Sequence, residues 1–329
     1  MDLTGAMRAA ADASWAVKGT TSPNPPVGAV ALDRDGAVVG TGATRPPGGP
    51  HAERVALDQA GGRAHTIVVT LEPCNHTGRT GPCAQALVEA GVRRVVVACT
   101  EPTDRAGGGV DTLRAAGVEV VTGFQAEEVA AGPLAAWLHV QRTGRPYVTW
   151  KYAATLDGRS AAADGTSRWI TGEAARAEVH TLRAQVDAVV VGSGTVLTDD
   201  PLLTVRPDPG HQPLRVVLDP RGRVPASARA LVGSALHVTG EVVLEDVLAD
   251  LAARGVVHVL LEGGPTLAAG FLRAGLVDDI RAYVAPALLG AGPAAVGDLG
   301  ITGIDEALRL QLVAVTRVGD DVRLDLRPR

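Results

Sequence analysis

The chain has 329 residues, and at about 150 residues per domain this length predicts roughly two domains. Hydrophobic residues make up 46% and charged residues 20%, so the chain has enough apolar material for folded cores and is not disordered. Its 40 Gly and 21 Pro follow no Gly-X-Y period, which excludes collagen. The net charge of −5 argues against a nucleic-acid partner, because proteins that bind phosphate backbones usually carry a basic patch.

The cysteine content and the N-terminal segment bear on the compartment of the protein. Three Cys are too few to cross-link a chain of this length into a disulfide framework. The N-terminal segment is interrupted by Asp2, Arg8 and Asp12, and no later segment offers 18 uncharged apolar residues. We therefore expect neither a signal peptide nor a membrane span, and a soluble, cytoplasmic protein.

The first part of the chain alternates between helical and strand-like patterns. Helical spacing of apolar residues runs from Leu3 to Val17, and Asp35-Gly36 between two Val-rich runs predicts a hairpin. The pattern then predicts strands over 27–32 and 37–42, a helix over 52–60, a strand over 66–71, a helix over 82–90, a strand over 93–99, a helix near 110–116, a strand over 118–121 and one long Ala-rich helix over 126–142. Gly144 and Pro146 stop that helix, which indicates domains over 1–144 and 145–329.

The second part restarts the alternation. It predicts a strand over 147–153, a helix over 172–185, strands over 187–192 and 214–219, a helix over 245–253, a strand over 256–264, a helix over 265–274, a strand over 279–288 and a closing hairpin over 310–326. We expect 279–288 and the closing hairpin to be edge strands. Strands that alternate with helices in both parts predict two α/β domains.

The strongest chemical signal joins His51 and Glu53 to the segment 70–83, TLEPCNHTGRTGPC. A His and the two thiolates of Cys74 and Cys83 are suitable zinc ligands, and three protein ligands leave a fourth position for water, as in catalytic zinc sites. Zinc lowers the pKa of such a water to about 7. Glu53 is then placed to carry a proton from the water to a leaving amine. Because Cys74 follows a buried strand, we expect it to open a helix or a turn, where a thiolate is favoured.

Simpler interpretations of the single residues are weaker than this combined one. A lone His-x-Glu is common, and a lone buried Cys is usually a small apolar residue, but their combination around a strand and a Pro-Cys pair is specific. Cys99 ends an apolar run without a partner motif, so we interpret it as a core residue. His76 lies between Cys74 and Cys83 and is assigned to substrate contact instead of to the metal.

The spacing of Cys74 and Cys83 distinguishes this chain from most zinc deaminases. Eight residues separate Cys74 from Cys83, whereas nucleic-acid and nucleoside deaminases usually have Pro-Cys-x-x-Cys. With this long loop the chain resembles the bifunctional deaminase/reductase family of riboflavin biosynthesis. The resemblance rests on motifs in order along nearly the whole chain: PNPPVGAV (23–30), HAE (51–53), LEPCNHTGRTGPC (71–83), KYAATLDGR (151–159), SRWIT (167–171), GTVLTDDPLLTVR (194–206) and LEGGPTL (261–267).

For the first domain, the resemblance implies a zinc deaminase with a cytidine-deaminase-like, three-layer α/β fold. It assigns zinc to His51, Cys74 and Cys83, catalytic acid–base chemistry to Glu53, and substrate binding to Asn24. His76 is added as a substrate contact on the ground of its loop position. The family usually has an Asp-Pro-Asn-Pro loop after the fourth strand, which helps to recognise the pyrimidine. This chain has Glu101-Pro102-Thr103-Asp104-Arg105 instead, so the role of that loop stays open.

Two Gly-rich strand ends mark the second domain, which has no Gly-x-Gly-x-x-Gly fingerprint. They are 192–195, Gly-Ser-Gly-Thr, and 262–266, Glu-Gly-Gly-Pro-Thr. Pro265 suits the first turn of a helix whose free N–H groups could face a phosphate, although each turn alone is more often a plain connection. Arg183 and Arg206 are candidate phosphate ligands because guanidinium binds phosphate through two hydrogen bonds, although a single Arg is more often a surface charge.

For the second domain, the resemblance implies a dihydrofolate-reductase-like α/β fold that binds NADPH and reduces a ribose 5-phosphate unit to ribitol. It assigns NADPH to Ala153, Trp169, Thr195, Asp199, Gly264, Pro265, Thr266, Leu267, Ala268, Ala269 and Gly270. It assigns substrate to Ser167, Arg183, Leu203, Arg206 and Glu262. We add Lys151, on the first strand of the domain, as a proton donor near the reduced carbon. Trp169 has an alternative interpretation as a core or domain-interface aromatic.

The sequence thus predicts a bifunctional enzyme with Zn²⁺ and NADPH as cofactors. It would deaminate 2,5-diamino-6-ribosylamino-4(3H)-pyrimidinone 5′-phosphate and then reduce the ribose to give 5-amino-6-ribitylamino-uracil 5′-phosphate. We expect small-molecule substrates, no nucleic-acid or membrane partner, and a homo-oligomer formed through the reductase domain.

Two other functions remain open at this stage. A nucleobase or tRNA deaminase whose second domain only docks substrate is disfavoured by the acidic net charge and the long cysteine loop. A zinc-stabilised nucleotide-binding regulator without turnover is disfavoured by Glu53, which a structural zinc site does not need.

Overall fold

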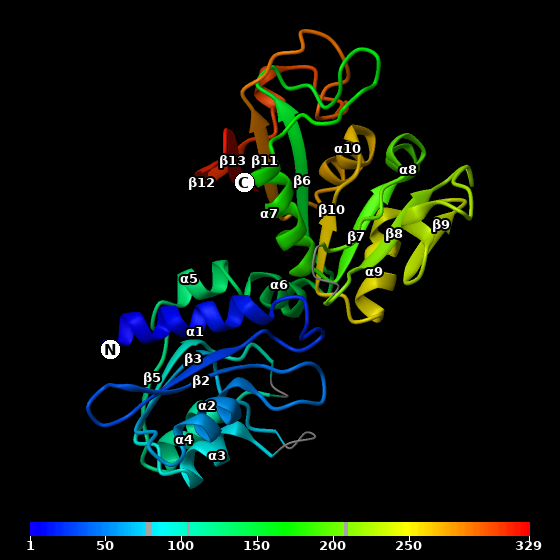
Figure 1. Ribbon diagram of the computed structural model, residues 1–329. Coiled ribbons are helices and arrows are strands. Elements are labelled where there is room, and N and C mark those ends of the chain that lie inside the picture. Colours follow the sequence, from blue (N-terminus) through cyan, green and yellow to red (C-terminus); the bar gives the residue numbers. More distant parts are fainter. Residues whose placement is uncertain (77–80, 104–105, 207–209) are drawn as a thin grey trace. The chain divides into compact units, whose positions relative to one another are not determined.

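The computed structural model describes residues 1–76, 81–103, 106–206 and 210–329, and the chain divides into two compact units, Met1–Gly144 and Arg145–Arg329. Each unit contains one sheet with its own helices (Figure 1). None of the described helices is both long and apolar enough to cross a membrane.

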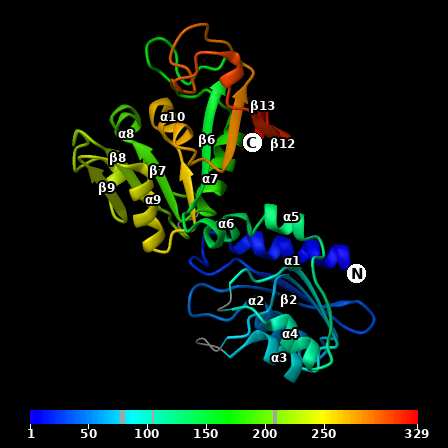
Figure 2. The ribbon, with the colours of Figure 1, turned by 180° about the vertical axis from the view of Figure 1, so that it is seen from behind.

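A mixed five-stranded sheet forms the centre of the first unit (Figures 1 and 2). Its strands are β1 (Gly28–Leu32), β2 (Val38–Ala43), β3 (Thr66–Leu71), β4 (Arg94–Cys99) and β5 (Glu119–Val121). Its helices are α1 (Leu3–Val17), α2 (Ala52–Ala60), α3 (Cys83–Glu89), α4 (Gly109–Ala115), α5 (Ala126–Ala131) and α6 (Ala135–Thr143). The order is β2-β1-β3-β4-β5, and β1 runs antiparallel to β2 and β3 while β3, β4 and β5 are parallel.

Two glycines show how the helices cover this sheet. A Cβ on Gly28 would lie 1.9 Å from the carbonyl oxygen of Ala10 in α1, and a Cβ on Gly42 would lie 2.1 Å from that of Ala52 in α2. Gly42 pairs with Ala29, the residue after Gly28, so the two glycines point to opposite faces. Helices α1 and α2 therefore cover opposite faces, as the predicted three-layer α/β fold requires.

One predicted helix of the first unit is in fact two. Helix α5 ends at Ala131 and α6 begins at Ala135, because Gly132-Pro133 stands between them. Proline has no backbone N–H, and its ring clashes with the preceding helical turn. The single helix expected over 126–142 is therefore wrong.

An eight-stranded sheet organises the second unit, in the order β12-β13-β11-β6-β10-β7-β8-β9. Its strands are β6 (Tyr147–Thr155), β7 (Ala188–Gly192), β8 (Leu214–Asp219), β9 (Ala235–Thr239), β10 (His258–Leu261), β11 (Asp279–Ala285), β12 (Leu310–Val318) and β13 (Asp321–Pro328). Its helices are α7 (Glu173–Ala184), α8 (Ser193–Asp199), α9 (Leu244–Ala253) and α10 (Pro265–Arg273), with short 3₁₀ turns at Arg229–Leu231 and Ile304–Glu306. The strands from β11 to β9 are parallel, and β13 is antiparallel to both of its neighbours.

Helices cover both faces of this sheet. In β7, Val189 and Val191 pack in the core cluster that contains Leu182 of α7. Val190 points to the other face and packs with Phe271 of α10 and with residues of α9. A strand that is buried on both sides reads as a continuous Val run, which is the pattern seen in the sequence.

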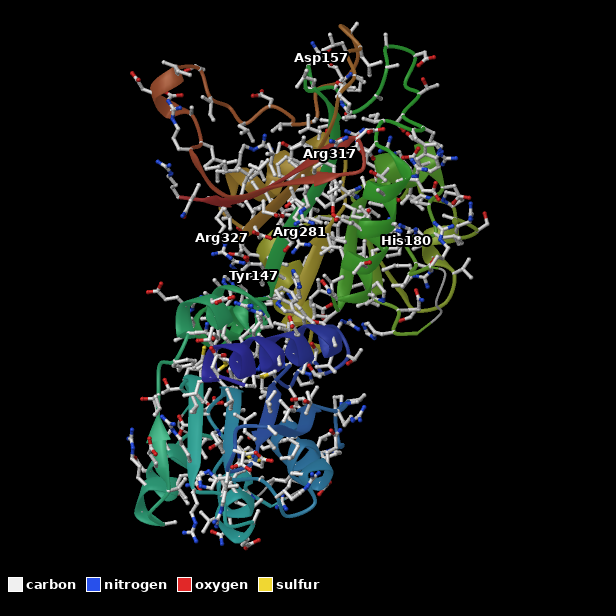
Figure 3. The ribbon with its side chains drawn as sticks, turned by 60° about the vertical axis from the view of Figure 1, so that its left-hand side comes forward. Tyr147, Asp157, His180, Arg281, Arg317 and Arg327 are labelled. Atoms are coloured by element: carbon white, nitrogen blue, oxygen red, sulfur yellow. The ribbon has the colours of Figure 1, made fainter. Side chains whose placement is uncertain are left out.

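The expectation about edge strands is partly wrong. Strand β11 lies between β13 and β6, and β13 lies between β12 and β11, so the edges of the described sheet are β12 and β9. Strand β11 gains its second neighbour from the closing hairpin, and Arg281 faces Asp325 of β13 across the pair, 3.7 Å away (Figure 3). Strand β9 and helix α8 were not predicted; both are short, with weak periodicity.

Replacing Gly28 by Ala should destabilise the first unit, because its Cβ would overlap the backbone of α1. We expect a loss of about 1–3 kcal/mol in the free energy of unfolding, measured by urea denaturation. Gly303→Ala is the matched control, since a Cβ at Gly303 meets no atom within 4 Å. Equal stability of the two variants would contradict the close approach of α1 to β1.

Candidate active sites

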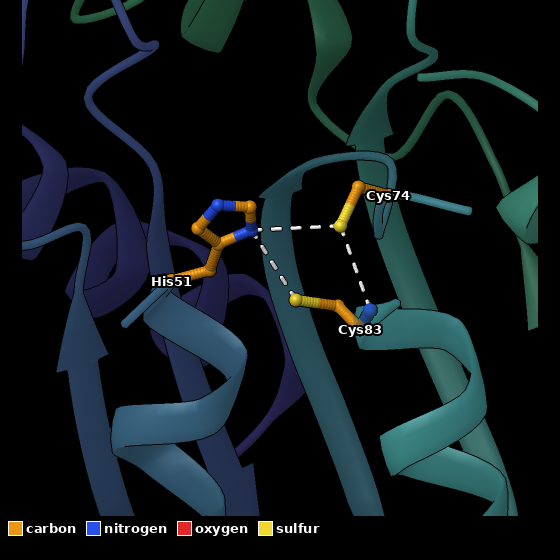
Figure 4. A group of neighbouring side chains, drawn as sticks. All are labelled: His51, Cys74 and Cys83. Atoms are coloured by element: carbon orange, nitrogen blue, oxygen red, sulfur yellow. Dashed lines mark hydrogen bonds between the residues drawn. The ribbon is translucent and has the colours of Figure 1, made fainter. Parts of the chain in front are cut away.

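Three potential ligands meet where β3 ends and where α2 and α3 begin (Figure 4). His51 is the N-cap of α2, Cys74 lies in an irregular segment after β3, and Cys83 is the first residue of α3. The Nδ1 atom of His51 lies 3.5 Å from Sγ of Cys74 and 3.4 Å from Sγ of Cys83. The expectation that Cys74 opens a helix or turn is wrong, since Cys83 is the residue that begins a helix.

The spacing of these atoms fits a zinc ion. Zn–N bonds of about 2.1 Å and Zn–S bonds of about 2.3 Å at a tetrahedral centre place N and S about 3.6 Å apart. The two His51–cysteine distances, 3.5 and 3.4 Å, are close to that value. Cys83 is buried, while His51 and Cys74 are half-buried. The donor set and its geometry therefore suit zinc with a position left for a non-protein ligand.

The groups around this centre have strongly shifted pKa values. The Cys83 thiol, by hydrogen bonding, and then His51 lower the pKa of Cys74 to about 4, against an opposing effect of burial. Glu53, in the first turn of α2, is only 3% exposed. Burial raises its pKa to about 7. A carboxyl group with this pKa can both accept and return a proton at neutral pH.

Glu72 holds the segment that carries Cys74. The buried carboxylate of Glu72 accepts hydrogen bonds from the N–H groups of Glu101, at 3.1 Å, and Val110, at 3.0 Å. It therefore ties the end of β3 to the end of β4 and to the start of α4. This role gives no signal in the sequence, because both partners of Glu72 are backbone groups far away in the chain.

The other predicted residues of the first unit lie in loops. Asn24 lies between α1 and β1 in a turn in which its N–H donates to the carbonyl oxygen of Thr21, at 2.9 Å. His76 follows Cys74, and its Nδ1 is buried without a hydrogen-bond partner among the described residues. In the altered loop, Glu101 accepts a hydrogen bond from the Thr103 hydroxyl, at 2.6 Å. Asp104 and Arg105 lie outside the described residues, so that loop is only partly placed.

Cys99 is a core residue, as predicted. It is 8% exposed at the end of β4, and its Sγ lies 3.7 Å from the carbonyl oxygen of Ala126. It lies apart from the group formed by His51, Cys74 and Cys83.

A pocket of about 1110 Å³ opens in the second unit beside α7. It collects most of the residues that the sequence analysis assigned to this domain: Lys151, Ser167, Trp169, Arg183, Thr195, Asp199, Leu203, Arg206 and Glu262. These residues come from segments more than 100 positions apart, and the sheet brings them together.

A buried ionic cluster forms part of the pocket lining. Strands β6 and β10 pair with Leu261 opposite Trp150, which places Glu262 beside Lys151. The Nε and Nη2 atoms of Arg183 donate to the two carboxylate oxygens of Glu262, at 2.6 and 2.9 Å, and Nζ of Lys151 lies 3.9 Å away. The two-pronged edge of Arg183 is thus occupied by Glu262.

Electrostatics keeps this cluster charged. Burial alone would raise the pKa of Glu262, but Arg183 and then Lys151 outweigh it and hold that pKa below its usual value. Burial lowers the pKa of Lys151, with Glu262 opposing the shift. Lys151 is therefore a stronger acid than a lysine in water.

Trp169 is 69% exposed in the pocket lining, so it is not a core residue. The guanidinium of Arg176 lies 4.5 Å from the centre of the indole ring, as in a cation–π contact. Its neighbour Arg168 donates to the carbonyl oxygen of Asp199, at 2.6 Å. Both arginines line the pocket, and sequence spacing gave no signal for either.

The Gly-rich strand ends lie side by side. Strands β7 and β10 are parallel neighbours, so α8 and α10 start at the same edge of the sheet. Gly264 caps α10, and a Cβ on it would lie 3.6 Å from the Thr195 hydroxyl oxygen. Ala268 and Ala269, by contrast, are buried in the core. None of residues 264–270 is in the pocket lining, although Gly264 lies next to Thr195, which is.

Each of the two units matches a known protein family. A family model for the cytidine and deoxycytidylate deaminase zinc-binding region matches residues 2–99, and one for the RibD C-terminal domain matches residues 146–324. The chain is 54% identical over 330 residues to the riboflavin biosynthesis protein RibD of Mycobacterium tuberculosis, which covers 98% of this chain and 96% of that protein.

Solved structures show the same similarity. The structure of RibD from Acinetobacter baumannii (form 1) matches with a TM-score of 0.90 and 38% identity over 100% of both chains. A diaminohydroxyphosphoribosylaminopyrimidine deaminase/5-amino-6-(5-phosphoribosylamino)uracil reductase from Thermotoga maritima matches with a TM-score of 0.91 and 32% identity over 99% of both chains. The chain therefore belongs to the family of bifunctional deaminase/reductases of riboflavin biosynthesis.

Proposed function

We propose how the described residues divide the work of this bifunctional enzyme of riboflavin biosynthesis. The first unit deaminates the diaminopyrimidinone ribosylamine phosphate, and the second reduces its ribose to ribitol with NADPH. The observation that carries the proposal is the zinc-sized spacing of His51, Cys74 and Cys83 beside the buried carboxyl group of Glu53.

In the first unit, His51, Cys74 and Cys83 would hold the zinc ion. Zinc, when bound, makes a water molecule acidic enough to attack near neutral pH. Glu53 takes a proton from the attacking water and returns it to the amine nitrogen, which leaves as ammonia. Asn24 and His76 hold the pyrimidine ring in this arrangement.

In the second unit, Lys151 and Glu262 lie at the centre of the reducing site. NADPH, when bound, supplies a hydride to C1 of the ribose, and the C1–O4 bond of the ring opens. Lys151 gives its proton to the released oxygen, and its burial next to Glu262 makes that transfer easier. Glu262 orients Lys151 and Arg183 through the ionic cluster.

The other NADPH and substrate contacts are assigned by where each residue lies in or near the pocket of the second unit. We assign NADPH to the side with Trp169, Thr195, Asp199 and the start of α10, where helical N–H groups are free to meet a phosphate. Substrate lies against the Ser167, Leu203 and Arg206 side. Ala153, Ala268 and Ala269 would act by shaping the backbone that these ligands touch, because their side chains pack in the core.

We also propose that the enzyme is a homo-oligomer formed through the second unit. Leu312 and Val315 of edge strand β12 are 55% and 60% exposed. They pair with Leu326 and Leu324 of β13, which are half-buried, and Leu326 packs against the core. The exposed apolar surface of this hairpin therefore lies on β12. A second copy that covers β12 would remove this apolar surface from water.

Glu53→Gln should retain zinc and lose deamination. The amide keeps the size of the side chain but cannot carry a proton, so the deamination rate should fall by about 10²–10⁴. Ammonia release and zinc content by elemental analysis measure the two effects. Cys74→Ser is the matched control and should lose zinc as well as activity. Zinc loss in Glu53→Gln, with Cys74→Ser active, would reverse the assignment.

Replacing Arg183 by Met should lower the stability of the protein, whereas replacing Arg206 by Met should weaken substrate binding. Arg183→Met leaves Glu262 buried without its main partner, so the free energy of unfolding should fall by about 3–5 kcal/mol. Arg206 is exposed, and its replacement should change stability by no more than about 0.5 kcal/mol while raising the KM for the phosphorylated substrate. Urea denaturation measures the free energy of unfolding of each variant, and NADPH-oxidation kinetics measure its KM for the phosphorylated substrate. A stability loss in Arg206→Met would contradict this division.

The two activities should separate with the two units. A fragment of residues 1–144 should release ammonia, and a fragment of residues 145–329 should oxidise NADPH, because each has its own sheet and core. Sedimentation should show self-association of the second fragment, lost on Leu312→Lys. If neither fragment folds while the whole chain does, the units depend on one another.

A further inference from the structure

Trp169 is a large aromatic residue that stays exposed in the pocket lining of the second unit. It is 69% exposed, whereas Tyr283, which also lines the pocket, is 1% exposed. An indole ring gains more from burial than most side chains do, because its surface is large and mostly apolar. Trp169 is therefore suited to meet a flat surface of a ligand.

The backbone on both sides of Trp169 is fixed by hydrogen bonds. Before it, the Nη2 atom of Arg168 donates to the carbonyl oxygen of Asp199, at 2.6 Å, and so ties the segment to the end of α8. After it, the N–H of Gly172 donates to the carboxylate of Asp321, a buried residue of β13, at 2.7 Å. The ring is thus carried by a segment anchored beside α8, on the side of the pocket assigned to NADPH.

Arg176 covers one face of the indole. It lies on α7, and its guanidinium carbon is 4.5 Å from the centre of the ring. Its Nη1 atom also donates to the carbonyl oxygen of Thr171, at 2.7 Å. The guanidinium is held by the ring and by the backbone two residues further along. Because one face is covered, the exposed surface of Trp169 belongs to the other face and to the edges of the ring.

We propose that Arg176 is a positioning residue for NADPH, because it holds the indole of Trp169 so that the uncovered face stacks on a flat ring of the cofactor. This inference rests on the NADPH site proposed above. Nicotinamide and adenine are both flat heterocycles, and offset stacking of two rings is favourable beyond the burial of their surface. Arg176 then acts on the cofactor through Trp169 and not by touching it.

The physical advantage of such a residue is that the ring is ordered before the cofactor arrives. An exposed Trp that is free to change rotamer loses this freedom when a ligand stacks on it, and the loss weakens binding. The attraction between the guanidinium and the indole face opposes that rotation in the free protein. Removal of Arg176 should therefore weaken NADPH binding and leave the chemistry of the reduction unchanged.

Binding of NADPH to the full-length protein without substrate, followed by the fluorescence of NADPH itself, tests the proposal. Arg176→Ala should raise the Kd for NADPH about three- to tenfold, the equivalent of one side chain that has to be immobilised. Arg176→Lys keeps a cation over the ring and should restore part of the loss. Arg254→Ala is the matched control, because Arg254 is an exposed arginine outside the pocket lining.

Kinetics and stability separate positioning from a general structural role. In Arg176→Ala, the KM for NADPH should rise while the KM for the phosphorylated substrate, the kcat and the urea midpoint stay near their wild-type values. A rise in both KM values together with a lower urea midpoint would make Arg176 a structural residue and overturn the proposal. An unchanged Kd for NADPH would overturn it as well.

A double-mutant cycle with Trp169→Leu tests whether Arg176 acts through the indole. Trp169→Leu should raise the Kd for NADPH on the order of tenfold, because the stacking partner is lost. In that background Arg176→Ala should change the Kd less than about twofold, since the two residues act as a pair. An equal effect of Arg176→Ala in both backgrounds would show that Arg176 contacts NADPH directly and would overturn the proposal.

Two fragments of the cofactor identify the ring that stacks. Adenosine 2′,5′-bisphosphate carries the adenine, and reduced nicotinamide mononucleotide carries the nicotinamide. The fragment whose Kd rises in Trp169→Leu contains the stacked ring, and either result supports the proposal, whereas two unchanged Kd values overturn it. Failure of the wild-type protein to bind NADPH would contradict the proposed NADPH site and with it the role of Arg176. Wild-type binding that Arg176→Ala leaves intact would contradict the role of Arg176 alone.

Discussion

Parallel strand pairing is the constraint on which both sites depend. Parallel neighbours end at the same edge of a sheet, so residues that follow different strands meet there. In the first unit, β3 and β4 pair in this way, and Glu72 after β3 binds the N–H of Glu101 after β4. In the second unit, β6 and β10 pair in parallel, and Glu262 after β10 reaches Lys151 on β6. In each unit, the register of parallel strands therefore decides which side chains meet at the site.

Burial affects the pKa values of the key carboxyl groups, Glu53 and Glu262, differently in the two sites. In the first unit, burial raises the pKa of Glu53 to about 7, which suits a group that both takes and gives a proton. In the second unit, the same desolvation acts on Glu262, but Arg183 and Lys151 outweigh it, and the carboxylate stays ionised. For Glu53, burial outweighs the neighbouring charge of His51, whereas for Glu262 the two cations outweigh burial and keep the carboxylate ionised.

Charge is also distributed unevenly between the pocket and the rest of the chain. An acidic protein would repel anionic ligands if its charges were spread evenly. Here the pocket of the second unit is lined by more basic than acidic side chains, while the net charge is −5. The acidic composition that argued against nucleic acid thus coexists with a local site for small phosphorylated molecules.

The sequence by itself determined the α/β class of both units, most helices and strands, and the residues that gather around the two centres. Local signals carry this information: Val runs for buried strands, Gly and Pro for stops, and the spacing of His51, Cys74 and Cys83 for the metal. The Gly132-Pro133 pair is a signal of the same local kind, since it separates α5 from α6.

Only the tertiary structure decided which distant side chains form ion pairs and hydrogen bonds with one another. Arg183 is expected from the sequence to bind phosphate, and β10 brings Glu262, 79 positions away in the chain, to its Nε and Nη2 atoms. The strand over 279–288 looked like an edge, but a later hairpin adds β13 beside it and pairs Arg281 with Asp325. The structural role of Glu72 gave no signal in the sequence. It depends on backbone partners that only long-range packing brings near, and spacing along the chain does not encode such distances.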